Sequence, residues 1–227
     1  TDGDTDTAEA QVNELLSKAW EQRKAFVYDV EPLPQSMQRA KDAAAAQGDG
    51  PVIVLDHYDN TASGGTMDTT EVLRAVLDAE LQRVAVFGFY DPDVVDQITT
   101  AGVGATVTVE LGGKLPMPAL TQQSQPLTLT GEVKLISSGK FEAKVAMARG
   151  LTMNMGTSAV LSVGPVDIAI ISRHIEPYDP ECFRSLGMEP TAYDYVMLKS
   201  RIHYRVGFQN MAKQVVECAG RGVCTSD

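Results

Sequence analysis

The fold is decided by residues 51–77, which read PVIVLDHYDNTASGGTMDTTEVLRAVL. The apolar run from Pro51 to Leu55 predicts a buried strand, and the apolar residues after Thr70 recur at helical spacing. Between them lies a polar loop with three carboxylates, one histidine and one amide. A plain strand-to-helix connection needs only about two to six residues. Ligands of open α/β sheets bind at the carboxyl ends of strands, so this loop is the first candidate site.

The rest of the chain extends this pattern. Helices are expected at residues 8–26, 35–46, 69–79 and 92–101, with strands at 51–55, 83–89 and 105–111. This alternation predicts parallel strands joined by helical crossovers. An antiparallel meander should follow, with β segments at 127–136, 141–148, 158–163 and 166–171, a short helix at 180–186 and strands at 195–199 and 214–217. We therefore expect an α/β fold, with a parallel or mixed sheet, flanking helices and an appended antiparallel β meander. Residues 1–7 are expected to be a disordered acidic lead-in, and residues 8–227 a single domain.

Composition narrows the function classes. The 227 residues carry a formal net charge of -11, which argues against nucleic acid or an anionic membrane as a partner, because both attract basic proteins. There is no run of about 18 apolar residues that would span a membrane. The first ten residues are acidic and polar, unlike a signal peptide, so a cytoplasmic location is expected. Three cysteines without a CxxC pair favour reduced thiols, although a Cys218–Cys224 bridge stays open.

The polar loop allows two interpretations. Gly64 and Gly65 could let backbone N–H groups converge on an anion at the start of the following helix, or they could simply turn the chain. The loop contains no lysine, so it is not a Walker-type nucleotide loop. Loop aspartates are most often turn residues, but Asp59 and Asn60 beside a glycine pair favour a functional role. Asp68 is expected to cap the helix.

A second polar cluster, KSRIHYR at residues 199–205, follows a later strand. Lys199, Ser200 and His203 could hold a carboxylate or phosphate, or the segment could be a solvated turn with salt bridges. Arg173 and His174 repeat this arrangement on a smaller scale after the strand at 166–171. The three histidines show no zinc-binding spacing, so no metal site is expected within this chain alone.

Taken in order, these segments resemble the C-terminal domain of the microcystinase C (MlrC) family, proteins regarded as zinc metallopeptidases. The matching segments are Trp20-x-x-Arg23, residues 50–54, Asp59-Asn60 through Gly64-Gly65 to Asp68-x-Thr70, Asp91-Pro92, residues 101–105, Leu111-Gly112-Gly113-Lys114, Ser172-Arg173, Phe183-x-Ser185-Leu186-Gly187 and Lys199-Ser200-x-x-His203-Tyr204. The resemblance runs from Trp20 to Gly222. Many relatives have a proline and three glycines where this chain has TASGG at 61–65.

The resemblance implies a hydrolase whose zinc is held by an N-terminal domain that is absent from this chain. This chain would then form one wall of an interdomain cleft for a peptide or amide substrate. Asp59, Asn60 and His203 would be catalytic, while Gly64, Gly65, Arg173, Lys199 and Ser200 would bind substrate. Two alternatives stay open: a non-catalytic module that binds a small anion, and a structural module that contacts the N-terminal domain or forms a homo-oligomer.

Overall fold

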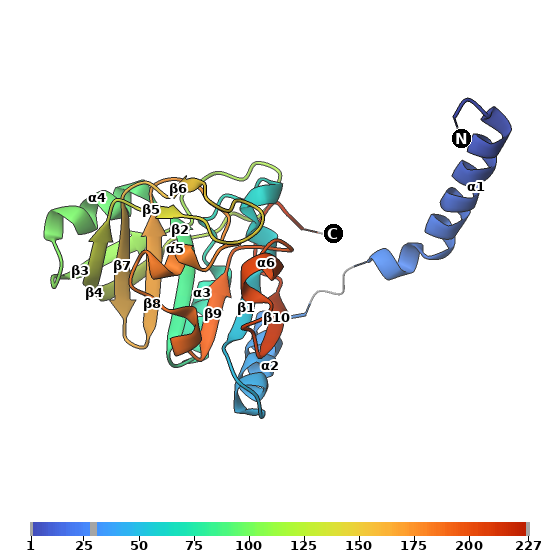
Figure 1. Cartoon of the computed structure of the whole chain (residues 1–227). Coiled ribbons are helices and arrows are strands. Elements are labelled where there is room, and N and C mark those ends of the chain that lie inside the picture. The colour runs from blue at the N-terminus through green and yellow to red at the C-terminus, as the bar shows by residue number, and fades with distance from the viewer. Residues whose placement is uncertain (1, 28–30, 226–227) are drawn as a thin grey trace. The chain divides into compact units, whose positions relative to one another are not determined.

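A computed structural model describes residues 2–27 and 31–225, which belong to two compact units (Figure 1). The N-terminal unit contains helix α1 (Thr5–Glu21) and the 3-10 helix η1 (Arg23–Phe26). Asp4 caps α1 by accepting a hydrogen bond from the backbone N–H of Thr7 at 3.1 Å. The helix therefore starts three residues before the predicted start, and residues 5–7 belong to it. None of the residues of α1 is buried.

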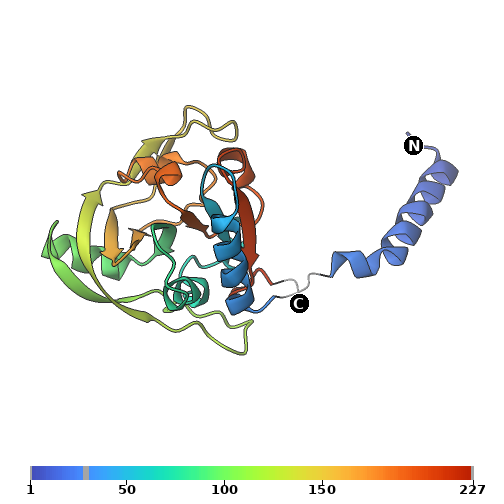
Figure 2. The same cartoon turned by 90° about the horizontal axis from the view of Figure 1, so that it is seen from below.

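The main unit, from Glu31 to Thr225, is built on an eight-stranded sheet (Figure 2). Its strands are β1 (Val52–Asp56), β2 (Val84–Tyr90), β3 (Thr106–Leu111), β4 (Leu127–Ser137), β7 (Ser158–Val163), β8 (Val166–Ile171), β9 (Tyr195–Leu198) and β10 (Gln214–Cys218). Their order across the sheet is β10-β1-β9-β2-β8-β7-β4-β3. The first five strands are parallel, whereas β7, β4 and β3 continue the sheet by antiparallel pairing. The predicted mixed α/β fold is confirmed.

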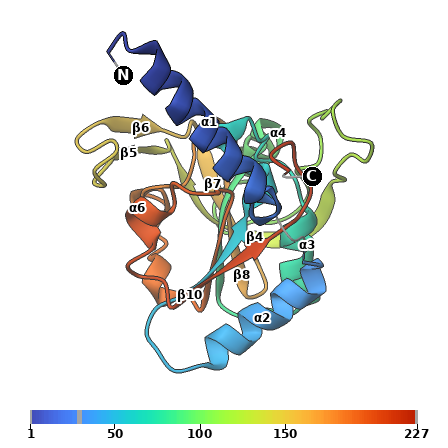
Figure 3. The ribbon, with the colours of Figure 1, turned by 90° about the vertical axis from the view of Figure 1, so that its right-hand side faces the viewer.

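Alternating strand residues face two apolar layers. Val52 and Val54 of β1 pack with helices α2 (Leu33–Ala45), α3 (Glu71–Asp78) and α4 (Pro92–Ala101), while Ile53 and Leu55 face the other layer. That second layer contains α5 (Glu181–Arg184), α6 (Arg205–Phe208) and a small sheet of β5 (Lys140–Glu142) and β6 (Thr152–Asn154). Figure 3 shows α6 and the β5–β6 pair on the left and α3 on the right. Both faces of the parallel strands are thus covered, as parallel sheets require.

Two predicted β segments differ from the structure. The strand at 105–111 was expected to be a third parallel strand, but β3 lies at the sheet edge and pairs antiparallel with β4. The β segment expected at 141–148 shortens to β5, because residues 143–151 form a loop. The Asp179 carboxylate holds this loop by accepting the backbone N–H groups of Lys144 and Val145 at 2.6 and 3.1 Å.

The described ranges contain no helix whose length and apolar character would allow it to cross a membrane. The three cysteines, Cys182, Cys218 and Cys224, are buried free thiols. The alternative of a Cys218–Cys224 bridge is therefore not realised in this structure.

Candidate functional site

Three polar loops follow the carboxyl ends of the parallel strands β1, β8 and β9, and we call this end of the sheet its carboxyl edge. Strands β1 and β9 are parallel neighbours, so the loop 57–70 after β1 lies beside residues 199–204 after β9. The segment that follows β8 joins them, because Nε2 of His174 lies 3.0 Å from the carbonyl oxygen of Thr66. The two polar clusters of the sequence therefore meet at the carboxyl edge of the parallel strands, where α/β folds place their ligands.

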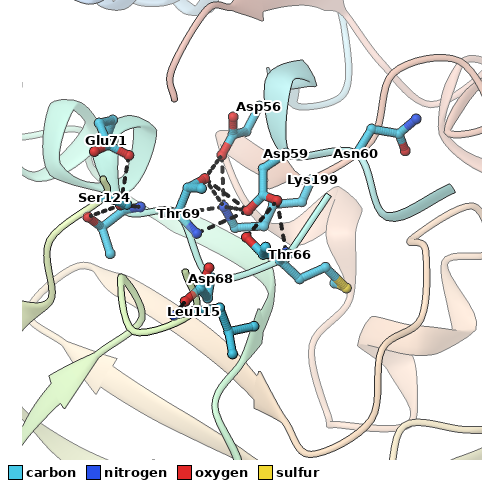
Figure 4. Close-up of polar contacts among 12 residues, drawn as sticks. Asp56, Asp59, Asn60, Thr66, Asp68, Thr69, Glu71, Leu115, Ser124 and Lys199 are labelled. Carbon is cyan, nitrogen blue, oxygen red and sulfur yellow. Dashed lines mark hydrogen bonds and ion pairs between the residues drawn. The ribbon is translucent and has the colours of Figure 1, made fainter. Parts of the chain in front are cut away.

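Lys199 lies at the centre of a buried network (Figure 4). Its Nζ is 2.8 Å from Oδ2 of Asp56 and 2.9 Å from Oδ2 of Asp59. It also donates to the backbone carbonyl and hydroxyl oxygens of Thr69 at 2.6 and 3.1 Å. The side chains of the three charged residues are at most 1% exposed. This arrangement differs from the predicted role of Lys199 in substrate binding, because its ammonium group already faces four acceptors inside the protein.

The pKa values of the two carboxylates, Asp56 and Asp59, are shifted in opposite directions. Burial raises the pKa of Asp56 to about 6, against the opposing effect of Lys199. Burial also disfavours ionised Asp59, but Lys199 and the N–H groups of Met67 and Thr69 outweigh it, so the pKa of Asp59 lies below its ordinary value. Asp59 accepts those N–H groups at 2.8 and 3.0 Å. Both carboxylates raise the pKa of Lys199 despite its burial, which keeps the ammonium charged.

The glycine pair shapes the loop around Asp59. A Cβ at residue 65 would lie 2.6 Å from the backbone carbon of Asp59, so only glycine fits there. Gly64 has a φ of +91° and an open surrounding. Asn60 is 4% exposed, and its Nδ2 donates to the hydroxyl of Ser63 at 2.9 Å. The side chains of Asp59 and Asn60 are therefore buried, and their hydrogen bonds hold the loop from inside the protein.

Asp68 has a different role from the predicted helix cap. Its Oδ2 accepts the backbone N–H groups of Lys114 and Leu115 at 2.8 and 2.7 Å. Helix α3 is capped from outside, because the hydroxyl of Ser124 accepts the N–H of Thr70 at 3.0 Å. Asp68 therefore ties the polar loop to the segment after β3.

His203 is the half-exposed group of this edge. Its side chain is 44% exposed, and its Nδ1 lies 2.7 Å from Oε2 of Glu176, whose side chain is 8% exposed. The other carboxylate oxygen of Glu176 accepts the buried hydroxyl of Ser200 at 2.9 Å. Arg173, a predicted substrate-binding residue, is exposed. Ser200, a predicted substrate-binding residue, instead supports Glu176, which the sequence analysis did not single out.

Metal binding is not supported within the part of the chain that the structure describes. No group of three His, Cys, Asp or Glu side chains comes together there in a way that could hold a metal ion. The paired carboxylates Asp56 and Asp59 are occupied by Lys199. We therefore assign no metal ligand to these residues.

Comparisons with known proteins agree with this fold. A crystal structure described as "Putative metallopeptidase" from Mesorhizobium sp. BNC1 superposes with a TM-score of 0.76 and 21% identity, over 91% of this chain and 40% of that chain. Microcystinase C from Sphingomonas sp. is 30% identical over 169 residues, which are 74% of this chain and 32% of that relative. The chain thus spans about a third of the length of this curated relative. The family model described as MlrC C-terminus matches residues 54–227, and the chain belongs to this family.

Proposed function

We propose that this chain is the C-terminal domain of a zinc-dependent peptide or amide hydrolase and forms one wall of its substrate cleft. The observation that carries the proposal is the match to the MlrC C-terminal family over residues 54–227. The relative named Microcystinase C and the neighbour described as a metallopeptidase fit this class of activity. In the proposal, zinc is held by a part of the whole protein outside this chain, because the described residues offer no ligand cluster.

The candidate residues at this edge differ in solvent exposure. His203 and Arg173 are accessible to a substrate, and we propose that they contact it. Asp59, Asn60 and Lys199 are buried, so we propose that they act by holding the loop, with Gly64 and Gly65 as its turn. This assignment narrows the expected set of catalytic residues on this chain to His203.

The test compares the full-length protein with the isolated chain. We expect the full-length protein to hydrolyse peptides in a zinc-dependent reaction, and the 227-residue chain to be inactive under the same conditions. In the full-length protein, His203→Gln should lower turnover without lowering the melting temperature, and the matched control His174→Gln should retain more activity. Zinc-dependent hydrolysis by the isolated chain would contradict the proposed division of labour, as would full activity of the His203→Gln variant.

The alternative of a small-anion site has less support, because Lys199 is committed to internal carboxylates. The alternative of a structural role has one specific observation in its favour. Helix α1 exposes Val12, Leu15, Leu16 and Trp20, with exposed fractions between 53% and 69%. Contiguous exposed apolar residues of this kind mark contact surfaces.

We propose that α1 packs against a part of the whole protein that lies outside this chain. In the isolated chain, its apolar residues should promote self-association that sedimentation velocity detects. Leu16→Glu should abolish this association, whereas the control Gln11→Glu adds a charge to the same helix without touching its apolar residues. A monomeric wild-type chain would refute the structural role of α1 and leave the hydrolase proposal untouched.

A further inference from the structure

Glu176 is a buried carboxylate that bridges two loops of the edge. It follows β8, between the buried residues Ile175 and Pro177. Its Oε1 accepts the hydroxyl of Ser200 at 2.9 Å, and its Oε2 lies 2.7 Å from Nδ1 of His203. Both of its oxygens are therefore engaged by residues that follow β9.

An ionised carboxylate only accepts hydrogen bonds, so the partner nitrogen of His203 must carry the proton. In a neutral imidazole with a protonated Nδ1, the other nitrogen, Nε2, has a free lone pair. We propose that Glu176 is a positioning residue that holds His203 in the Nδ1–H tautomer and presents Nε2 to the substrate as an acceptor. The substrate part of this inference rests on the proposed function, whereas the tautomer does not.

The surroundings of Glu176 fix this arrangement. Ser200 is fully buried, and its hydroxyl oxygen also accepts the backbone N–H of Tyr204 at 3.3 Å. Tyr204 is itself 3% exposed, so the turn that carries His203 is anchored on both sides of the histidine. Because Ser200 holds one carboxylate oxygen, the other stays directed at the imidazole.

The tautomer limits the group that His203 can recognise. A lone pair at Nε2 accepts a hydrogen bond from an N–H group, such as a peptide amide, but faces a carboxylate unfavourably. The expectation that His203 helps to hold a substrate carboxylate is thus replaced by a more specific one. His203 accepts a hydrogen bond from an N–H group of a peptide or amide substrate.

Nitrogen NMR of the chain labelled with 15N-histidine tests the tautomer directly. The chain has only three histidines, so His203→Gln assigns the resonances of residue 203. At pH 8.5, where imidazoles are ordinarily neutral, we expect the Nδ1–H form to exceed the Nε2–H form at least about tenfold, since hydrogen bonds to charged groups favour it. A wild-type spectrum in which residue 203 has mainly the Nε2–H form overturns the inference.

Two variants test whether Glu176 is the cause. Glu176→Met should bring the two tautomers to within a few-fold of each other, whereas Glu176→Gln should retain the Nδ1–H form because its amide oxygen can still accept. Glu181→Met is the matched control, since this carboxylate pairs with Lys144 and Arg184. An unchanged tautomer ratio in folded Glu176→Met would overturn the role of Glu176.

The full-length protein then separates this inference from the proposed function. Glu176→Met should lower kcat only a few-fold, less than His203→Gln does, because the imidazole remains and part of it still adopts the Nδ1–H form. In the double variant Glu176→Met should add little to the loss caused by His203→Gln, because it acts only through His203. Glu176→Gln should restore most of the loss. If the tautomer is confirmed but neither variant changes hydrolysis, the positioning stands and the catalytic role of His203 fails.

Discussion

The buried Asp56–Lys199–Asp59 network makes a quantitative prediction about pH. The network pairs two carboxylates with one ammonium group, and burial raises the pKa of Asp56 from 3.8 to about 6 in the folded chain. A carboxyl group with a raised pKa in the folded state stabilises the fold at low pH, and this contribution is lost as the pH rises through the folded value. At about 1.4 kcal/mol per pKa unit, the loss between pH 3.5 and pH 7 is about 3 kcal/mol.

The perturbation that isolates this effect is Asp56→Asn, which keeps the shape and removes the titration. Its amide oxygen can still accept from Lys199, but its NH₂ group replaces the buried Oδ1, which has no partner among the described residues. That group costs about 1–3 kcal/mol at every pH. The variant should therefore be less stable than the wild type at pH 4, and it should regain about 2.4 kcal/mol relative to the wild type by pH 7.

Urea unfolding followed by far-UV circular dichroism at several pH values measures this difference. The single tryptophan, Trp20, lies on the exposed helix α1, so its fluorescence does not report on the main unit. Asp49→Asn makes the same charge change at an exposed position and is the matched control. A stability difference between Asp56→Asn and the wild type that stays constant from pH 4 to pH 7.5 would refute the assignment of the raised pKa to Asp56.

Three further predictions concern the same edge. Lys199→Met leaves Asp56 and Asp59 buried without their cation, so the free energy of unfolding should fall by about 3–5 kcal/mol in urea titrations, and adding Asp56→Asn and Asp59→Asn should recover much of it. A loss below about 1 kcal/mol would show that the carboxylates find other partners. Gly65→Ala places a Cβ against the backbone, so it should lower the stability of the chain more than Gly64→Ala does. Gly64→Ala meets only the penalty of a left-handed backbone conformation, about 1–2 kcal/mol. A lower melting temperature for Gly64→Ala than for Gly65→Ala would contradict this loop geometry. Asp68→Ala removes the acceptor for two backbone N–H groups, so hydrogen exchange at Lys114 and Leu115 should accelerate at least about tenfold, while exchange at Val94, which Asp91 caps, should not change.

The positions of the helices and strands were predicted better than the parallel or antiparallel direction of the strands. The Asp91-Pro92 pair was expected to start a helix, and the Asp91 side chain does accept the N–H of Val94 at 3.2 Å. The direction of β3 was missed, although its sequence contains the signal. Thr106, Thr108 and Glu110 alternate with apolar residues, which is typical of an antiparallel strand with one solvated face, whereas β1 is apolar from Val52 to Leu55.

The site was harder to predict because its contacts join distant parts of the chain. Asp59 and Lys199 are 140 residues apart, and they meet only because β9 lies between β1 and β2 in the sheet. One local signal was available in the sequence. Asp56 ends the fully buried strand β1 and Lys199 directly follows the fully buried strand β9, and a charged residue at such a position almost always needs a buried partner. Glu176 offered no such pattern, since its partners follow another strand and only the folded chain brings them together.

The buried residues at the carboxyl edge can contribute to stability, whereas only its exposed residues can contact a substrate. Asp56, Asp59 and Lys199 pair with one another inside the protein, so their side chains cannot also contact a substrate. They do fix the loop 57–70 against β9, and the next residue after Lys199, Ser200, orients Glu176 and through it His203. A rigid support of this kind is what a catalytic side chain requires, because small displacements of such groups cost large factors in rate. We therefore propose that the buried network and the half-exposed His203 are two parts of one structure, in which the network supports the turn that carries the histidine.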